Sequence, residues 1–101
     1  MNNMTLPIKI TDRALEEAVY IFENKNIPQD YALRVGMKSG GCGAAGFFIG
    51  FDTPKEHDEV YQTDNMKVLV DRRHLMYLLN MELDFEDRED ERGFVFNKAE
   101  E

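Results

Sequence analysis

The feature that most constrains the fold is an alternation of apolar and polar side chains that returns in several short runs. Leu33, Val35 and Met37 alternate with Arg34 and Lys38, a pattern that buries one face of a strand and leaves the other in water. The runs that predict strands are residues 8–10, 33–37, 47–51, 60–63, 66–70, 83–85 and 94–96. Polar turns separate most of these runs, so the chain lacks the strand–helix rhythm of a parallel α/β fold.

Two stretches depart from this alternation and predict helices. Apolar side chains recur at helical spacing at Ala14, Leu15, Ala18, Val19 and Phe22. Thr11 or Asp12 can cap the start of that helix, and residues 24–26 with Pro28 end it. Asp71 can cap a second, shorter helix, which Asn80 can end in the left-handed conformation. We therefore expect a mainly β (α+β) fold, with about seven short strands in two mixed sheets and two helices.

One domain is expected over residues 1–101, because the length suits a single core and no linker or repeat interrupts it. We expect flexible ends at residues 1–6 and 98–101. The highly charged segment EDREDER, residues 86–92, predicts a turn between the last two strands.

The charge balance excludes some classes of partner. The net charge is −8, and the only tight basic cluster is Arg72-Arg73, so a nucleic-acid backbone is not an expected ligand. No window reaches the roughly 18 unbroken apolar residues that a membrane span needs. The start, MNNMTLPIKI, lacks the pattern of a signal peptide, and we expect a cytoplasmic protein with no membrane partner.

Residues 39–48, SGGCGAAGFF, place the only cysteine, Cys42, among glycines. Gly41, Gly43 and Gly46 spell the GxGxxG of dinucleotide-binding loops, but that motif requires a helix to begin at the loop. The run that follows, FFIGF, predicts a strand, which argues against nucleotide binding. A single cysteine also excludes an internal disulfide and a self-contained metal site of the CxxC type.

Five segments occur in the order found in the HesB-like family, the A-type carriers of iron–sulfur cluster assembly. They are ITDRA, LRVGMKSGGCG, VLVDRRHLMYL, ELDF and GFVFN. The resemblance extends from Ile8 to Asn97, nearly without gaps. It implies a HesB-like sandwich of short strands with two helices, assembled as a homo-oligomer.

The resemblance also implies a function in iron–sulfur cluster biogenesis. Family members bind iron or a cluster between subunits and pass it to recipient apoproteins, and they are carriers rather than enzymes. They use three cysteines: Cys42 matches the one in the glycine loop, whereas the Cys-Gly-Cys pair near the C-terminus has no counterpart in this sequence. The resemblance therefore implies that Cys42 is a ligand and that Gly40, Gly41 and Gly43 shape its loop.

The remaining ligands are an open question, because two chains supply two thiolates and a cluster usually takes four. Other ligands could be histidine, carboxylate, water or a small thiol such as glutathione. The secondary candidates within the chain are His57, His74, Glu100 and Glu101. Carboxylates are hard ligands and replace thiolates poorly.

Two other functions compete with cluster carriage. The chain could be a HesB-like module that binds proteins and no metal, in which case Cys42 is only a small residue in a turn. It could also be a thiol-dependent enzyme, which needs a base or a positive environment to lower the pKa of Cys42. Lys38 precedes Cys42 by four residues, and no histidine is near it in the sequence.

Overall fold

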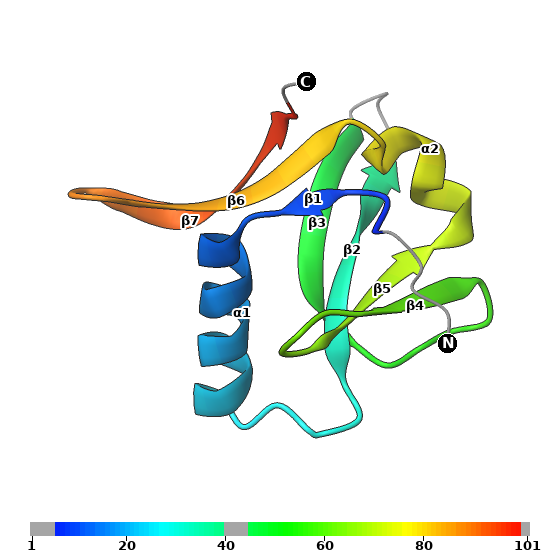
Figure 1. Ribbon diagram of the computed structural model, residues 1–101, viewed down its shortest axis with the longest axis horizontal. Coiled ribbons are helices and arrows are strands. Elements are labelled where there is room, and N and C mark those ends of the chain that lie inside the picture. The colour runs from blue at the N-terminus through cyan, green and yellow to red at the C-terminus, as the bar shows by residue number, and fades with distance from the viewer. Residues whose placement is uncertain (1–5, 40–44, 100–101) are drawn as a thin grey trace.

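The computed structural model describes residues 6–39 and 45–99 (Figure 1). Within these residues, seven strands form two sheets, and two α-helices and one short 3-10 helix accompany them. Each sheet contains one parallel and at least one antiparallel pair of strands. The expected mainly β fold with two mixed sheets and two helices is therefore confirmed.

The first helix, α1, spans Asp12–Asn24 and begins where the sequence predicts. Thr11 is its N-cap, and the Thr11 hydroxyl accepts a hydrogen bond from the Ala14 N–H at 3.1 Å. Ala14 and Ala18 form the fully buried part of its apolar stripe. Asn26 follows the helix with a φ of 57°, a left-handed conformation that asparagine tolerates better than most residues.

The larger sheet has four strands in the order β3-β2-β5-β4. Their bounds are β2 Ala32–Ser39, β3 Ala45–Asp52, β4 Asp58–Gln62 and β5 Lys67–Asp71. β2 is antiparallel to β3 and parallel to β5, whereas β4 and β5 are antiparallel. β2 and β5 are therefore the two central strands, and they supply the buried residues Leu33, Val35, Val68 and Val70.

The smaller sheet joins the two ends of the chain. Its order is β1-β6-β7, with β1 at Lys9–Ile10, β6 at Met81–Arg88 and β7 at Glu91–Lys98. β1 lies parallel to β6, and β6 and β7 form a long antiparallel hairpin. The turn of this hairpin projects away from the rest of the molecule in Figure 1.

A short helical segment connects the two sheets. It consists of a 3-10 helix, η1, at Arg72–His74, followed by α2 at Leu75–Leu78. The Asp71 carboxylate caps its start by accepting the Arg73 N–H at 2.9 Å. Asn80 follows with a φ of 68°, so both the cap and the left-handed end are as expected.

A single core lies where α1, α2 and the two sheets meet. The fully buried large side chains are Ile8, Leu33, Val35, Val68, Leu69, Val70, Leu78 and Leu83. Every element except η1 therefore contributes to, or packs next to, the same apolar interior, and Tyr61 is the contribution of β4.

The expected turn over residues 86–92 is wrong. Two strands extend into this segment, and only residues 89–90 form the turn. Asp87 lies directly opposite Arg92, with Arg92 Nε 3.2 Å from Asp87 Oδ1. Opposite charges facing each other across a hairpin favour pairing, so a run that looks like a solvated turn can form two strands.

The folded part of the chain also reaches into both segments that we expected to be flexible ends. Leu6 packs against the core. Lys98 is the last residue of β7, and the Ala99 N–H donates to the Asn80 carbonyl at 2.7 Å. Residues 1–5 and 100–101 lie outside the described residues.

Candidate functional site

The strands β2 and β3 lead into and out of the segment that contains Cys42. Their pairing runs in register from Ala32 opposite Asp52 to Ser39 opposite Ala45. Residues 40–44, with Cys42 and the three glycines predicted to shape its loop, lie outside the described residues. The structure therefore shows where this connection begins and ends, at one end of the four-stranded sheet (Figure 1).

Gly36, three residues before the end of β2, lies close to the rings of Phe48 and His74. It lies opposite Phe48 in the sheet. A Cβ atom at Gly36 would lie 2.9 Å from Cε1 of Phe48 and 3.0 Å from Nδ1 of His74. Both distances are shorter than a normal contact, so a side chain at this position would push the two rings away. Gly36 is not among the residues predicted from the sequence, although an isolated glycine inside a strand pattern is a known sign of close approach.

His74, one of the secondary ligand candidates, makes a hydrogen bond to β2. Its Nδ1 atom accepts the Met37 N–H at 3.3 Å. A neutral imidazole that accepts at Nδ1 carries its proton on Nε2, so neither nitrogen has a free lone pair. To bind a metal, His74 would have to give up this bond or lose its proton. The observed contacts thus favour a structural role, in which His74 holds η1 and α2 against β2.

His57 lies in the turn before β4 and is half-buried. Its carbonyl accepts the Arg72 N–H at 2.8 Å, which places the backbone of His57 beside the segment that carries His74. Within residues 6–39 and 45–99, no group of three or more histidine, cysteine, aspartate or glutamate side chains is arranged to hold a metal ion. Glu100 and Glu101 lie outside the described residues, and their assignment as ligands stays a prediction.

Aromatic packing fixes the start of β3 next to the last strand. The rings of Phe47 and Phe96 are stacked with their centroids 5.1 Å apart. This contact joins the four-stranded sheet to β7 close to Ala45, the first residue of β3. Offset stacking of this kind adds to the stability gained from burial alone.

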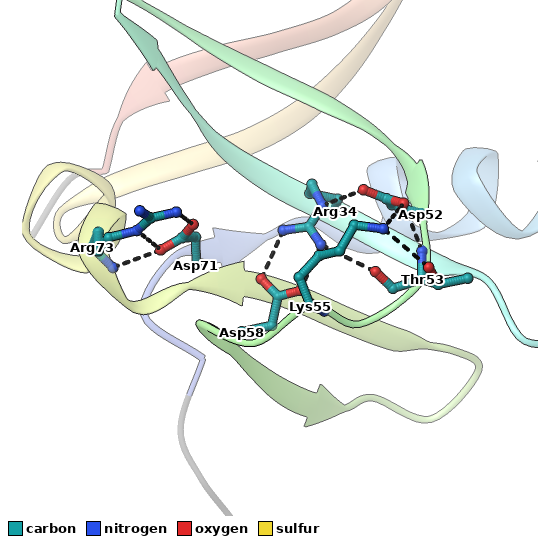
Figure 2. Close-up of polar contacts among 7 residues, drawn as sticks. All are labelled: Arg34, Asp52, Thr53, Lys55, Asp58, Asp71 and Arg73. Carbon is teal, nitrogen blue, oxygen red and sulfur yellow. Dashed lines mark hydrogen bonds and ion pairs between the residues drawn. The ribbon is translucent and has the colours of Figure 1, made fainter.

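A network centred on Arg34 anchors the turn between β3 and β4 (Figure 2). Nη1 and Nη2 of Arg34 donate to the two carboxylate oxygens of Asp58 at 2.7 and 2.5 Å, and Nε donates to Asp52 at 3.0 Å. The Lys55 N–H also donates to Asp58 at 2.6 Å. The side chain of Asp58 is almost entirely buried, and a bidentate pair with arginine is among the strongest arrangements for such a carboxylate. The network is satisfied internally and serves the fold.

Several carboxylates are held in their charged form by these contacts. The Arg34 hydrogen bond lowers the pKa of Asp58, and the hydrogen bond from Arg73 lowers the pKa of Asp71 well below its ordinary value. The Thr53 N–H lowers the pKa of Asp52, and the Thr11 hydroxyl lowers that of Asp84. In each case the hydrogen bond favours the ionised form.

In the described part of the chain, no helix is both long and apolar enough to span a membrane.

Comparison with known proteins identifies the family. The family model for iron–sulphur cluster biosynthesis matches residues 6–99, which include all of the described residues. This chain belongs to the iron–sulphur cluster biosynthesis family. The resemblance to the HesB-like A-type carriers is thereby confirmed.

Individual relatives and solved structures match this chain over most of its length. The iron-binding protein IscA of Xenorhabdus nematophila is 31% identical over 93 residues, covering 91% of this chain and 85% of the relative. The crystal structure of Escherichia coli SufA, involved in biosynthesis of iron–sulfur clusters, has a TM-score of 0.69 at 21% identity and covers 96% of this chain and 85% of SufA. A crystal structure of IscA with the [2Fe–2S] cluster has a TM-score of 0.67 at 16% identity, over 90% and 81% of the two chains. At these identities the two structures show the fold alone.

Proposed function

We propose that the protein is an accessory factor of iron–sulphur cluster biogenesis that carries iron or a cluster and passes it to apoproteins. The observation that carries this proposal is family membership over residues 6–99, together with a fold shared with an IscA structure that holds a [2Fe–2S] cluster. The proposal describes a carrier, with no catalytic step of its own. Iron or the cluster is the cargo.

Cys42 is the proposed ligand of the cargo, at an interface between two copies of the chain. Thiolates are the usual ligands of iron–sulfur clusters, and this sequence contains one cysteine. Two copies therefore contribute two thiolates. We propose that a small thiol such as glutathione completes the coordination, because Nδ1 of His74 is already an acceptor for Met37. Exchangeable outside ligands suit a protein that must release what it carries.

The test is anaerobic reconstitution of the purified chain with ferrous iron and sulfide, with and without glutathione. The measurements are the visible absorption spectrum and the ratio of iron to protein, and the matched control is the Cys42→Ser variant. We expect sulfur-to-iron charge-transfer bands that depend on Cys42 and strengthen with glutathione. An iron-free, colourless protein under both conditions would contradict carriage and favour a protein-binding module that holds no metal.

If a cluster is reconstituted, the next experiment tests whether the chain transfers it to an apoprotein. The reconstituted chain is mixed with an apo-ferredoxin and a metal chelator, and cluster arrival is followed by circular dichroism. A carrier delivers its cluster faster than free iron and sulfide assemble one in the presence of the chelator. Equal rates would show that the cluster is released to solvent instead of being transferred.

A further inference from the structure

The segment formed by η1, α2 and Leu79 exposes large apolar side chains on its outer side. Leu78 points into the core, whereas Met76 is 83% exposed and Tyr77 is 58% exposed, and Leu79 is exposed as well. Six large apolar residues of the described chain are exposed, and three of them lie within residues 76–79. A solvent-facing helical turn normally carries polar residues, so an apolar cluster of this kind marks an interaction surface.

Two arginines border this apolar cluster. Arg73 is held by Asp71 through Nε and Nη2, at 2.9 and 2.6 Å, which leaves Nη1 and one further N–H unused. Arg72 pairs with Glu59 at 3.6 Å between partly exposed groups, a contact that is worth little and can be exchanged. Residues 72–80 contain no acidic residue, in a chain with a net charge of −8. We call Arg72, Arg73, Met76, Tyr77 and Leu79 the α2 face.

A second copy of the chain is a poor partner for the α2 face. A two-fold contact centred on the α2 face would bring the four arginines of two copies into one interface, where residues 72–80 supply no acidic residue to pair with them. The acidic partner available on the chain itself is the hairpin turn, where residues 86–92 contain five acidic and two basic residues. That turn lies on the opposite side of the molecule in Figure 1, so such a contact would be head-to-tail and would join copies into a ring or an open chain instead of a two-fold dimer. The charge pattern therefore favours a different protein, with an apolar centre and an acidic rim.

The α2 face lies close to the strand ends that flank residues 40–44, the residues that include the proposed ligand Cys42. His74 lies in the same helical segment and is bonded to Met37, two residues before Ser39 at the end of β2. In Figure 1, α2 lies at the same end of the molecule as the ends of β2 and β3 that flank residues 40–44. A protein bound to the α2 face would lie beside the ends of β2 and β3 that flank residues 40–44.

We infer that the α2 face is the docking surface for an acidic apoprotein that receives the cluster. The inference rests on the proposed function for the identity of the partner, whereas the surface itself is defined by its exposure and charge. Apolar contact by Met76, Tyr77 and Leu79 supplies affinity, and the two arginines select acidic partners and speed their association.

The test measures binding without a cluster. The Cys42→Ser variant is titrated with an acidic plant-type [2Fe–2S] ferredoxin in its apo form, by calorimetry, at low and at high ionic strength. We expect measurable binding that weakens as salt is added. Because no cluster takes part, failure to reconstitute the wild-type chain would contradict the proposed function and leave this test intact. Absence of binding at low salt would overturn the docking inference, whatever the outcome of reconstitution.

Matched variants identify the surface. Tyr77→Ser is compared with Tyr20→Ser, since Tyr20 on α1 is equally exposed at 60%. Arg73→Gln is compared with Arg88→Gln in the hairpin, because the two arginine side chains are 65% and 64% exposed. We expect Tyr77→Ser to weaken binding by about tenfold and Arg73→Gln to reduce the salt dependence, with both controls unchanged. Equal effects of a variant and its control would overturn the assignment.

Sedimentation equilibrium of the free chain tests whether a second copy of the chain binds to the α2 face. If self-association exists and is abolished by Tyr77→Ser but not by Tyr20→Ser, the α2 face is an interface between copies, and the inference is wrong. If oligomers persist in Tyr77→Ser while ferredoxin binding is lost, the α2 face is separate from the subunit interface, as proposed.

Discussion

Replacing Gly36 with alanine should destabilise the protein through two identifiable contacts. The new Cβ would lie 2.9 Å from Cε1 and 3.1 Å from Cζ of Phe48, and 3.0 Å from Nδ1 of His74. Carbon atoms normally approach to about 3.5–4.0 Å, so the Phe48 ring must retreat by about 0.6 Å or more. A shift of His74 would weaken its bond with the Met37 N–H, which contributes about 1 kcal/mol.

The expected change in the free energy of unfolding is the difference between a cost of overpacking and a gain from removing a glycine. Overpacking of a tight site costs about 1–3 kcal/mol. Removing a glycine gains about 0.4–1 kcal/mol by restricting the unfolded chain. We therefore expect Gly36→Ala to lower the free energy of unfolding by about 1–2 kcal/mol, or roughly 5–10 °C in Tm for a domain of this size.

The assay is urea unfolding followed by far-UV circular dichroism, since the sequence contains no tryptophan. Gly50→Ala is the matched control: Gly50 lies in the adjacent strand β3, and a Cβ there meets nothing within 4 Å. It should be neutral or slightly stabilising. In a Phe48→Leu background, which removes the ring atoms, the cost of Gly36→Ala should shrink. Equal stability of Gly36→Ala and Gly50→Ala, or an unchanged cost in the Phe48→Leu background, would refute the steric explanation.

Three further predictions concern the polar contacts. Asp58→Asn should lower the free energy of unfolding by about 2–3 kcal/mol in urea, because it breaks the bidentate pair with Arg34, whereas Asp90→Asn at the exposed hairpin turn should have no effect. Stability should be nearly constant above about pH 5 and fall below about pH 4. The reason is that the pKa values of Asp58, Asp71 and Asp84 are lowered in the folded state, which therefore binds fewer protons than the unfolded state. The check is the Tm measured against pH, and Asp84→Asn should make the fall shallower. Thr11→Ala should cost about 1–2 kcal/mol because it removes both the cap of α1 and the 2.7 Å hydrogen bond to Asp84, and Thr11→Ser should retain most of that stability.

Much of the fold could be predicted from local pattern. The alternation around Leu33 and Val35 gives β2, and the apolar spacing of Ala14 and Ala18 gives α1. Asn80 has the left-handed φ that its place after a short helix predicts. These features depend on neighbours in sequence, so a single sequence contains the information.

The features that sequence reasoning missed depend on register between distant strands. The pairing of Asp87 with Arg92 turns a charged run into a hairpin, and it requires knowing which residues face each other. The same holds for Arg34, whose partner Asp58 lies beyond β3, in a segment that reads as a plain polar turn. An isolated glycine in a strand, such as Gly36, can be recognised from the sequence. The ring of Phe48 that explains it belongs to the neighbouring strand, which the sequence alone does not identify.

The pairing of β1 with β6 has a consequence for how the chain folds as it is synthesised. Thr11 and Asp84, which are 73 residues apart, share a hydrogen bond, and the Thr11 N–H donates to the Leu83 carbonyl at 3.0 Å. When α1 leaves the ribosome, the strands that cover Ala14 and Ala18 have not yet been made. Contacts over such long separations slow folding, and the waiting apolar surface is prone to aggregate. The first helix and the β6–β7 hairpin are therefore expected to become stable together, after synthesis has passed Lys98.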